Sequence, residues 1–245
     1  MNSLQDYVSI SFTLVFIAFT AMAVYLYSER DRVPEQFRTA VRVSAIYLFI
    51  AAINYYYMMN MYGAAQAAGQ AQFPTSFRYI DWILTTPLML IKFPLLLGVG
   101  EKGTRFMTRL VILDLIMIVC GYVGEVNQQG SLAVHWGFFV GGCAAWIAIA
   151  VQLFVALVDL PPQTSESVRA GIRTMGLFVV AGWAIYPLGY FSPLLGFPPD
   201  IRELVYNIAD IINKCGLCLI VYVTAKRAAV ELDSLPELAD DAALA

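Results

Sequence analysis

Long apolar stretches separated by short polar turns make up most of this chain. Seven stretches are long enough to cross a bilayer as a helix, which takes roughly 20 residues. The turns between them carry proline and glycine, as in Leu160-Pro-Pro and Gly196-Phe-Pro-Pro. The pattern therefore predicts an all-α, seven-transmembrane-helix bundle. The predicted helices cover about residues 6–28, 39–62, 77–98, 105–125, 131–158, 167–192 and 202–227.

The composition also indicates a membrane protein. Of the 245 residues, 60% are hydrophobic and 13% are charged, and the mean hydropathy is +0.68. A soluble domain of this size carries about twice that charged fraction, so the surplus apolar surface is expected to face the lipid bilayer. The net charge of −3 and the lack of a basic block argue against nucleic acid as a partner. The cysteines lie in apolar stretches and His135 is the only histidine, so we expect neither a metal site nor a disulfide.

Basic residues are unevenly distributed over the connections. They flank the first, third and fifth connections and end the last helix, whereas the other connections hold almost none apart from Arg202. The positive-inside rule therefore predicts an outside N-terminus and a cytoplasmic C-terminus. We expect a transmembrane domain over residues 1–228, with a retained first helix rather than a signal peptide, and a disordered acidic tail over 229–245. The sequence does not decide whether the uncharged connection at residues 63–76 forms a small hairpin.

One acid and one amine share a face of the seventh predicted helix. Asp210 and Lys214 are four residues apart, which places them about 6 Å apart along the helix axis. A charged group at membrane depth costs roughly 2.5 to 3.5 kcal/mol by insertion measurements, so the pair needs a reason. The spacing alone leaves open whether it is a structural ion pair or a functional site.

A polar stripe follows the third predicted helix. Asp81 and Lys92 are eleven residues apart, a net rotation of about 20° and a rise of about 16 Å. Arg78 and Thr85 fall on the same face. A row of titratable groups across a membrane is the arrangement expected for proton relay. The alternative is a set of polar contacts that hold the helices together.

Three motifs in the same order resemble those of microbial (type I) rhodopsins. Residues 78–89 (Arg-Tyr-Ile-Asp-Trp-Ile-Leu-Thr-Thr-Pro-Leu-Met) resemble the third helix of that family. Residues 182–187 (Gly-Trp-Ala-Ile-Tyr-Pro) resemble the sixth helix, and residues 210–214 (Asp-Ile-Ile-Asn-Lys) the seventh. Residues 114–117 (Asp-Leu-Ile-Met) and 121–125 (Gly-Tyr-Val-Gly-Glu) resemble the fourth. The resemblance covers all seven helices and is strongest to proteorhodopsin-like proton pumps. It implies a retinal protein of the bacterial inner membrane that is not an enzyme and forms a homo-oligomer.

The resemblance implies a role for each matching residue. Lys214 would carry all-trans retinal as a covalent Schiff base, with Asp81 as proton acceptor and Asp210 as counterion. Arg78 would keep the outer side positive, and Thr85 would hydrogen-bond Asp81. The residues implied around the retinal are Trp82, Thr86, Met89 (as in the green-absorbing type), Met117, Trp146, Trp183, Tyr186 and Pro187, with Tyr55 and Tyr206 as partners of Asp210.

Two positions depart from the usual pattern of these pumps. Lys92 stands where most members have a carboxylic acid that reprotonates the Schiff base from the cytoplasmic side. Burial favours the neutral amine, so Lys92 would take up a cytoplasmic proton and pass it inward. The alternative is that its side chain extends to the cytoplasmic surface near Gly98. Asn54 stands where proteorhodopsins have a histidine beside the acceptor; it can hydrogen-bond Asp81 but carries no charge.

The remaining polar residues are placed by their position along the helices. We expect Asp114 to hydrogen-bond Thr86 rather than to relay protons. Glu125 and Glu203, near the outer ends of the fourth and seventh helices, are candidates for the proton-release path. His135 is expected to be a surface residue.

The leading functional hypothesis is an outward light-driven proton pump, and the alternative is a photosensory rhodopsin that signals to a partner. An anion pump is disfavoured because Asp81 would repel the anion, and the sodium-pump signature calls for a different set of residues on helix three. A helical scaffold without a chromophore is a third possibility. We do not expect a carotenoid antenna, because Trp146 is bulky where antenna-binding relatives have a glycine.

Overall fold

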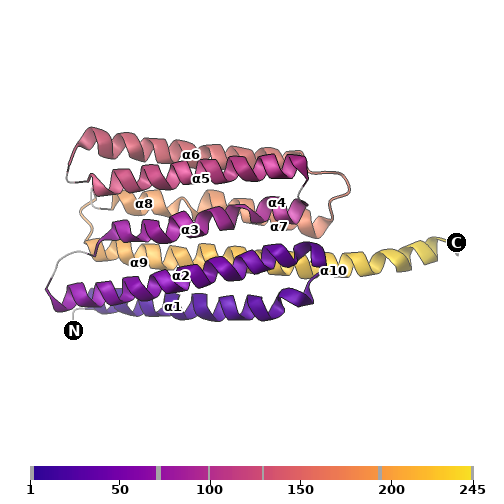
Figure 1. Ribbon diagram of the computed structural model, residues 1–245, viewed down its shortest axis with the longest axis horizontal. Helices are drawn as coiled ribbons and strands as arrows, with labels where there is room; N and C mark the ends of the chain where they lie inside the picture. Colours follow the sequence, from indigo (N-terminus) through magenta and orange to yellow (C-terminus); the bar gives the residue numbers. More distant parts are fainter. Residues whose placement is uncertain (1–2, 70–72, 99, 129, 193–194, 244–245) are drawn as a thin grey trace.

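Each apolar stretch of the sequence forms a helix in the computed structural model, and the helices pack side by side as an elongated bundle (Figure 1). The structure describes residues 3–69, 73–98, 100–128, 130–192 and 195–243, with side chains up to residue 232, and this part of the chain contains no strand. The prediction of a seven-helix, all-α fold is confirmed. The described membrane-length helices cover Leu4–Arg32, Glu35–Ala67, Thr75–Leu97, Glu101–Val126, Leu132–Val158, Glu166–Phe191 and Pro199–Leu232.

Four of these spans are built almost entirely from one regular helix each. They are α1 (Ser3–Glu29, followed by η1, Arg30–Arg32), α2 (Glu35–Ala67), α5 (Glu101–Val126) and α6 (Leu132–Val158). The other three are broken where the sequence places proline, glycine or the functional residues. The third span comprises η2 (Thr75–Phe77), α3 (Arg78–Leu90) and α4 (Lys92–Leu97); the sixth comprises α7 (Glu166–Leu177), η3 (Phe178–Gly182) and α8 (Ile185–Phe191); the seventh comprises α9 (Pro199–Asp210), η4 (Ile211–Cys215) and α10 (Gly216–Ala243).

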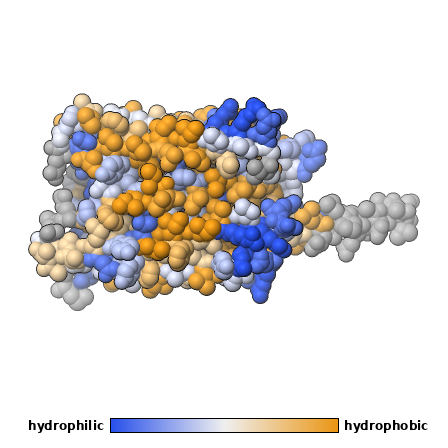
Figure 2. All heavy atoms as spheres, in the orientation of Figure 1, coloured by the Kyte–Doolittle hydropathy of each residue, from blue (hydrophilic) through white to orange (hydrophobic). Residues whose placement is uncertain are grey.

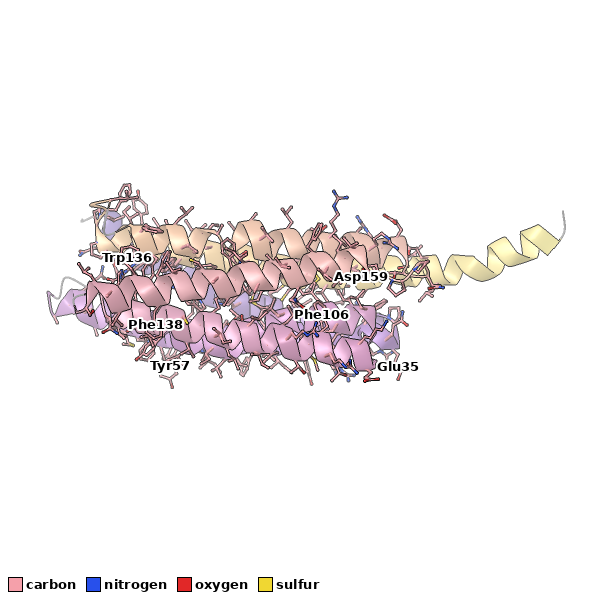
Figure 3. All side chains as sticks on the ribbon, turned by 90° about the horizontal axis from the view of Figure 1, so that it is seen from above. Glu35, Tyr57, Phe106, Trp136, Phe138 and Asp159 are labelled. Atoms are coloured by element: carbon pink, nitrogen blue, oxygen red, sulfur yellow. The ribbon has the colours of Figure 1, made fainter. Side chains whose placement is uncertain are left out.

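The surface of the bundle matches a protein embedded in lipid. Figure 2 shows a broad band of hydrophobic residues across its middle, with hydrophilic residues gathered towards the end from which α10 emerges. Tyr57 and Phe138, labelled in Figure 3, are 58% and 39% exposed, as expected for side chains that face acyl chains. Glu35 and Asp159 lie near the end of the bundle where α10 leaves it. The chain is therefore a multi-pass membrane protein.

Two turns of π-helix face each other across the sixth and seventh spans. η3 ends at Gly182, and the Nδ2 of Asn213 in η4 donates to the Gly182 carbonyl at 3.1 Å. A Cβ at position 182 would collide with the Asn213 side chain, so only glycine permits this approach. The wider π turns change the register of each helix by one residue, and such turns are frequent at functional sites. They fix the direction in which Lys214, within η4, presents its side chain.

The C-terminal end of the chain differs from the expectation. α10 continues to Ala243 and projects beyond the bundle (Figure 1), so its helical backbone runs through most of the segment expected as a disordered tail. The division into a bundle and a tail stays a prediction. Residues 70–72, in the connection for which a hairpin was left open, lie outside the described residues.

Candidate functional site

The centre of the bundle holds one amine between two carboxylates. The Nζ of Lys214 lies 2.5 Å from Oδ2 of Asp81 on α3 and 2.7 Å from Oδ2 of Asp210 at the end of α9. All three side chains are at most 2% exposed. Removing one member of such a buried cluster would leave an uncompensated charge, so the cluster must act as a unit. The expectation that Asp81 faces the Asp210–Lys214 pair is confirmed.

Asp210 is held at both of its carboxylate oxygens. The hydroxyl of Tyr55 donates to Oδ2 at 2.8 Å, and the hydroxyl of Tyr186 donates to Oδ1 at 2.5 Å. Tyr55 was expected as a partner, and the structure confirms it. The expectation for Tyr206 is wrong, because its hydroxyl donates instead to the backbone carbonyl of Tyr186 at 3.1 Å. Tyr186 on α8 therefore bonds to Asp210, although Tyr206 lies on the same helix, α9, as Asp210.

Asp81 is held on one side only. Its Oδ2 accepts from Lys214, whereas its buried Oδ1 accepts no hydrogen bond from any protein group that the structure describes. Thr85 does bond to Asp81, but its hydroxyl donates to the backbone carbonyl at 2.8 Å rather than to the carboxylate. The possible bond from Asn54 is not formed, since its Nδ2 donates to the Ile50 carbonyl one turn back on α2. The two carboxylates beside Lys214 are therefore unequal.

A chain of buried ionic groups leads from this centre towards the opposite end from α10. The Nη1 of Arg78 donates to the Tyr55 hydroxyl at 3.0 Å, and its Nη2 lies 2.7 Å from the Glu203 carboxylate. Glu203 in turn accepts from Thr75 at 2.5 Å, and Thr75 accepts from Arg202 at 2.6 Å. Arg78 and Glu203 are almost completely buried. Arg78 thus reaches Asp210 through a tyrosine rather than by direct contact.

The network ends at the fourth span. Arg202 Nη1 lies 3.1 Å from Oε1 of Glu125 on α5. Glu125 and Glu203, which the sequence places only near two helix ends, therefore belong to one network bridged by Arg202 and Thr75. Sequence reasoning named Arg202 only as an exception among the connections. An arginine at the start of a mostly apolar helix was the available signal that a carboxylate partner lies nearby.

An apolar cavity opens beside the Lys214 amine. Its lining includes every residue implied around the retinal except Tyr55, which contacts Asp210 from the other side. Among the described lining residues, only Asp210 and Lys214 carry charged side chains. The cavity is therefore lined mainly by apolar and aromatic side chains and is ionic where Lys214 borders it. The rings of Trp82 and Tyr186 pack edge to face at a centroid distance of 5.1 Å. The expected lining residues found there are Trp82, Thr86, Met89, Met117, Trp146, Trp183, Tyr186, Pro187, Tyr206 and Lys214.

The cavity also has a wall that the sequence reasoning missed. Gly121 on α5 and Gly142 on α6 lie in the lining together with Phe139 and Cys143. A Cβ at Gly121 would lie 2.8 Å from a ring carbon of Tyr79, and one at Gly142 would lie 3.4 Å from the Met117 carbonyl. Glycine at these positions lets α5, α6 and the third span approach one another. Glycines inside two otherwise apolar helices were the available signal.

Lys92 lies deep in the protein on the α10 side of the centre. Its side chain is fully buried, and its Nζ donates to the Tyr47 hydroxyl at 3.0 Å. The alternative that it extends to the surface near Gly98 is therefore wrong. Among the described residues no carboxylate lies within ion-pair distance of this amine. The cost of burying an unpaired charge favours the neutral amine here.

Two further polar residues complete the interior. Asp114 accepts a hydrogen bond from Thr86 at 2.8 Å, as expected. His135 was expected at the surface, but it is only 6% exposed. Its Nδ1 lies 2.7 Å from the Gly124 carbonyl and 2.9 Å from the Tyr190 hydroxyl, and its ring stacks on that of Tyr190. The packing of α8 against the start of α6 removes it from the surface.

A family model of bacteriorhodopsin-like proteins matches residues 6–228 of the chain. The chain belongs to this family. It is similar to the green-light absorbing proteorhodopsin of the gamma-proteobacterium EBAC31A08, with 36% identity over 227 residues that cover 90% of this chain and 87% of the relative. The family membership explains why charged groups lie at membrane depth: the resemblance read from three motifs is confirmed.

Solved structures of bacteriorhodopsin-like proteins have the same fold. The crystal structure of Exiguobacterium sibiricum rhodopsin is 38% identical and superposes with a TM-score of 0.80, covering 90% of this chain and 96% of that one. Xanthorhodopsin, described as a light-driven ion pump with a dual chromophore, is 27% identical with a TM-score of 0.86, covering 95% and 97%. The helix arrangement of this chain is thus that of the microbial rhodopsins.

Members of the family bind retinal, and the interior of this bacteriorhodopsin-like chain fits that group. A polyene needs a long apolar slot bounded by aromatic planes, which the cavity beside Trp82 and Trp183 provides. Covalent attachment needs an amine at one end of the slot, and Lys214 supplies it. A positively charged nitrogen at that point needs nearby negative charge, and Asp81 and Asp210 supply this.

Proposed function

We propose that this protein is an outward light-driven proton pump, with its N-terminus outside and the α10 end in the cytoplasm. The similarity to proteorhodopsins, at 36% identity for the green-absorbing protein and 32% for the blue-absorbing one, supports this assignment. A sensory rhodopsin, sensory rhodopsin-2 of Haloarcula vallismortis, is more distant at 28%. The basic residues at the α10 end support the orientation.

The observation that carries the proposal is the inequality of Asp81 and Asp210. Lys214 would hold all-trans retinal covalently as a Schiff base, and the bound group would supply light-driven isomerisation at this nitrogen. Asp81 is the proton acceptor because its free Oδ1 can take a proton without breaking a hydrogen bond. Asp210 stays ionised as the counterion, because Tyr55, Tyr186 and Lys214 already occupy its oxygens.

The outward path starts at Arg78. Once Asp81 is neutral, the negative charge near Arg78 is reduced, and its guanidinium is drawn more strongly to Glu203. This change favours release of a proton from the Glu203–Thr75–Arg202–Glu125 network to the outside. Together with Arg78, the network holds two arginines and two glutamates, so it can lose one proton without acquiring a large net charge in a low-dielectric interior.

The inward path starts at Lys92. A neutral amine at this depth takes a proton from the cytoplasmic side and passes it to the Lys214 nitrogen, which restores the resting state. The burial of Lys92 and its lack of a carboxylate partner support this role. Because the resting amine is neutral, proton uptake at Lys92 precedes or accompanies its donation, unlike the order expected for a carboxylic acid donor.

The direct test is light-induced pH change in a suspension of cells or oriented vesicles that contain the protein with retinal. A pump with the proposed orientation acidifies the medium of intact cells, and a protonophore abolishes the signal. Absence of a pH change together with a photocycle lasting seconds would instead favour the sensor. Absence of any visible absorption band after retinal addition would favour the scaffold.

A further inference from the structure

A compact polar cluster surrounds Lys92 between α2, α4 and α10. Tyr47 and Ser44 come from α2, Lys92 begins α4, and Cys218 lies in the first turn of α10. Tyr47, Lys92 and Cys218 are fully buried, and Ser44 is 1% exposed. Tyr47 and Cys218 were not among the expected functional residues. A tyrosine hydroxyl that is fully buried needs hydrogen-bond partners within the protein.

The Tyr47 hydroxyl is fully used by three groups. It donates to the backbone carbonyl of Lys214 at 2.8 Å. It accepts from Lys92 Nζ at 3.0 Å and lies 2.7 Å from the thiol sulfur of Cys218. A phenol has one donor and two acceptor positions, so this set saturates it. The direction of every bond follows: the single phenolic proton points to the Lys214 peptide, and the amine and the thiol donate to the oxygen.

This arrangement determines how Lys92 can behave. An ammonium group has three N–H donors, and Tyr47 provides one acceptor for them. The neutral amine leaves fewer donors without partners, so the cluster stabilises the neutral form by geometry. Tyr47 cannot take the proton itself without giving up its bond to the Lys214 carbonyl. It therefore orients the amine and remains a neutral phenol.

The carbonyl that Tyr47 binds belongs to the lysine at the centre of the site. Lys214 lies in η4, where the π turn changes the ordinary backbone hydrogen bonding of the helix. Tyr47 is consequently bonded to Lys92 on one side and to the Lys214 peptide on the other. These two hydrogen bonds link the backbone of η4 to the amine through one hydroxyl.

We propose that Tyr47, with its hydroxyl fixed by Cys218, is the positioning residue of the Lys92 donor and connects it mechanically to the Lys214 peptide. The inference rests on the proposed function, because it assumes that Lys92 delivers a proton. In that step an N–H bond of the Lys92 ammonium breaks, the proton goes to Lys214 Nζ, and the electron pair stays on the Lys92 nitrogen. Tyr47 keeps its proton throughout.

The first test is the infrared S–H stretching band of the full-length protein, recorded with and without retinal. The band of Cys218 is identified by its loss in Cys218→Ala. Tyr47→Phe removes the nearer acceptor of this thiol and leaves the more distant Ser44 carbonyl at 3.7 Å, so we expect the Cys218 band to move to higher frequency in both preparations. This readout reports on the contact itself and does not require a photocycle.

The second test is the rate of late reprotonation after a flash, measured over a range of pH. Losing one net hydrogen bond corresponds to a change of about fivefold, so we expect Tyr47→Phe to slow this step by at least that factor and to change its pH profile. Cys218→Ala slows it less, and Cys218→Ser, which keeps a donor, restores it. Cys120→Ala is the matched control, because this free cysteine lies on α5, which contributes no residue to the cluster.

The outcomes separate the inference from the proposed function. An unchanged late step in Lys92→Ala rejects the donor role, and with it the proposed function of Lys92. A slow Lys92→Ala together with an unchanged Tyr47→Phe overturns the positioning role alone. A shifted S–H band without any change in rate or pH profile also overturns it, because Tyr47 would then be only a packing residue. If Tyr47→Phe does not fold, the late reprotonation rates of Cys218→Ala and Cys218→Ser are compared instead. Equal rates in these two variants and the unmodified protein would overturn the positioning role.

Discussion

Asp81 contacts the Lys214 nitrogen through one carboxylate oxygen at 2.5 Å, while its other oxygen accepts no hydrogen bond from the described protein groups. This one-sided contact distinguishes it from Asp210, whose two oxygens are both bound. An acid held by a single donor loses little when it gains a proton and its donor moves away. An acid held by two tyrosines loses more.

Replacing Asp81 should change the absorption band without loss of retinal and should abolish proton transport. We expect Asp81→Asn to retain retinal but to shift the absorption band to longer wavelength, since the carboxylate no longer stabilises the positive charge at the nitrogen in the ground state. The acid-induced colour change of the unmodified protein should be absent, and light-driven acidification should be lost. A visible spectrum titrated with pH measures the first two effects, and a pH electrode measures the third.

Asp114→Asn is the control for that experiment. Asp114 is equally buried and bonds to Thr86, but it does not contact Lys214. It should keep the acid-induced colour change and the transport. If Asp81→Asn pumped protons normally, the assignment of the acceptor would be wrong.

Removal of the Lys92 amine should affect only the late part of the cycle. We expect Lys92→Ala to slow reprotonation at least tenfold, because general acid catalysis by a positioned group typically contributes about 10² to 10⁴. A small, membrane-permeable weak acid in the buffer should restore part of the rate by replacing the donor. Flash photolysis follows the rate. Lys102→Ala, which removes an exposed lysine of α5, should have no effect.

The network around Arg202 should contribute to the stability of the protein. Arg202 bridges Glu125, Thr75 and Glu203, and these side chains are all buried. Arg202→Gln leaves the buried Glu125 carboxylate without its cation, whereas Glu203 keeps Arg78. Breaking a buried pair in this way costs about 3 to 5 kcal/mol. The thermal midpoint should therefore fall. Adding Glu125→Gln to this variant should recover part of the loss, since one uncompensated charge is removed; additive losses in the double variant would contradict the network.

A glycine on α8 should be required for the shape of the cavity. A Cβ at Gly189 would lie 2.9 Å from the hydroxyl-bearing ring carbon of Tyr206, with a ring carbon closer still. We expect Gly189→Ala to displace Tyr206, to change the absorption maximum and to destabilise the protein by about 1 to 3 kcal/mol through overpacking. Gly137→Ala is the comparison, because a Cβ there meets nothing within 4 Å. Equal behaviour of the two variants would exclude the steric argument.

Much of the site follows from helical periodicity within single helices. Asp210 and Lys214 share one face of the seventh span, and Arg78 and Asp81 share one face of the third, as their spacing predicts. The apolar lengths predict the seven spans to within a few residues of those observed. Residues of one helix have fixed relative positions, because the backbone hydrogen bonds determine the rotation and rise between them.

Contacts between helices did not follow from the sequence in the same way. The structure pairs Asp210 with Tyr186 rather than Tyr206, turns Asn54 to its own helix, and buries His135 against Tyr190. Each outcome depends on how one helix is rotated about its axis relative to the next. Single-helix spacing carries no information about that rotation, and the π turns η3 and η4 change it again within the sixth and seventh spans.

The sequence by itself therefore determined the number of helices, the polar faces of the third and seventh helices, and the lysine at the centre. The tertiary structure decided which carboxylate keeps a free oxygen, and which hydroxyl binds the amine of Lys92. The physical reason is that a polar group buried in a membrane protein must find its partner across helices. That partner is selected by helix packing, which brings together residues far apart in the chain, such as Tyr47, Lys92 and Cys218.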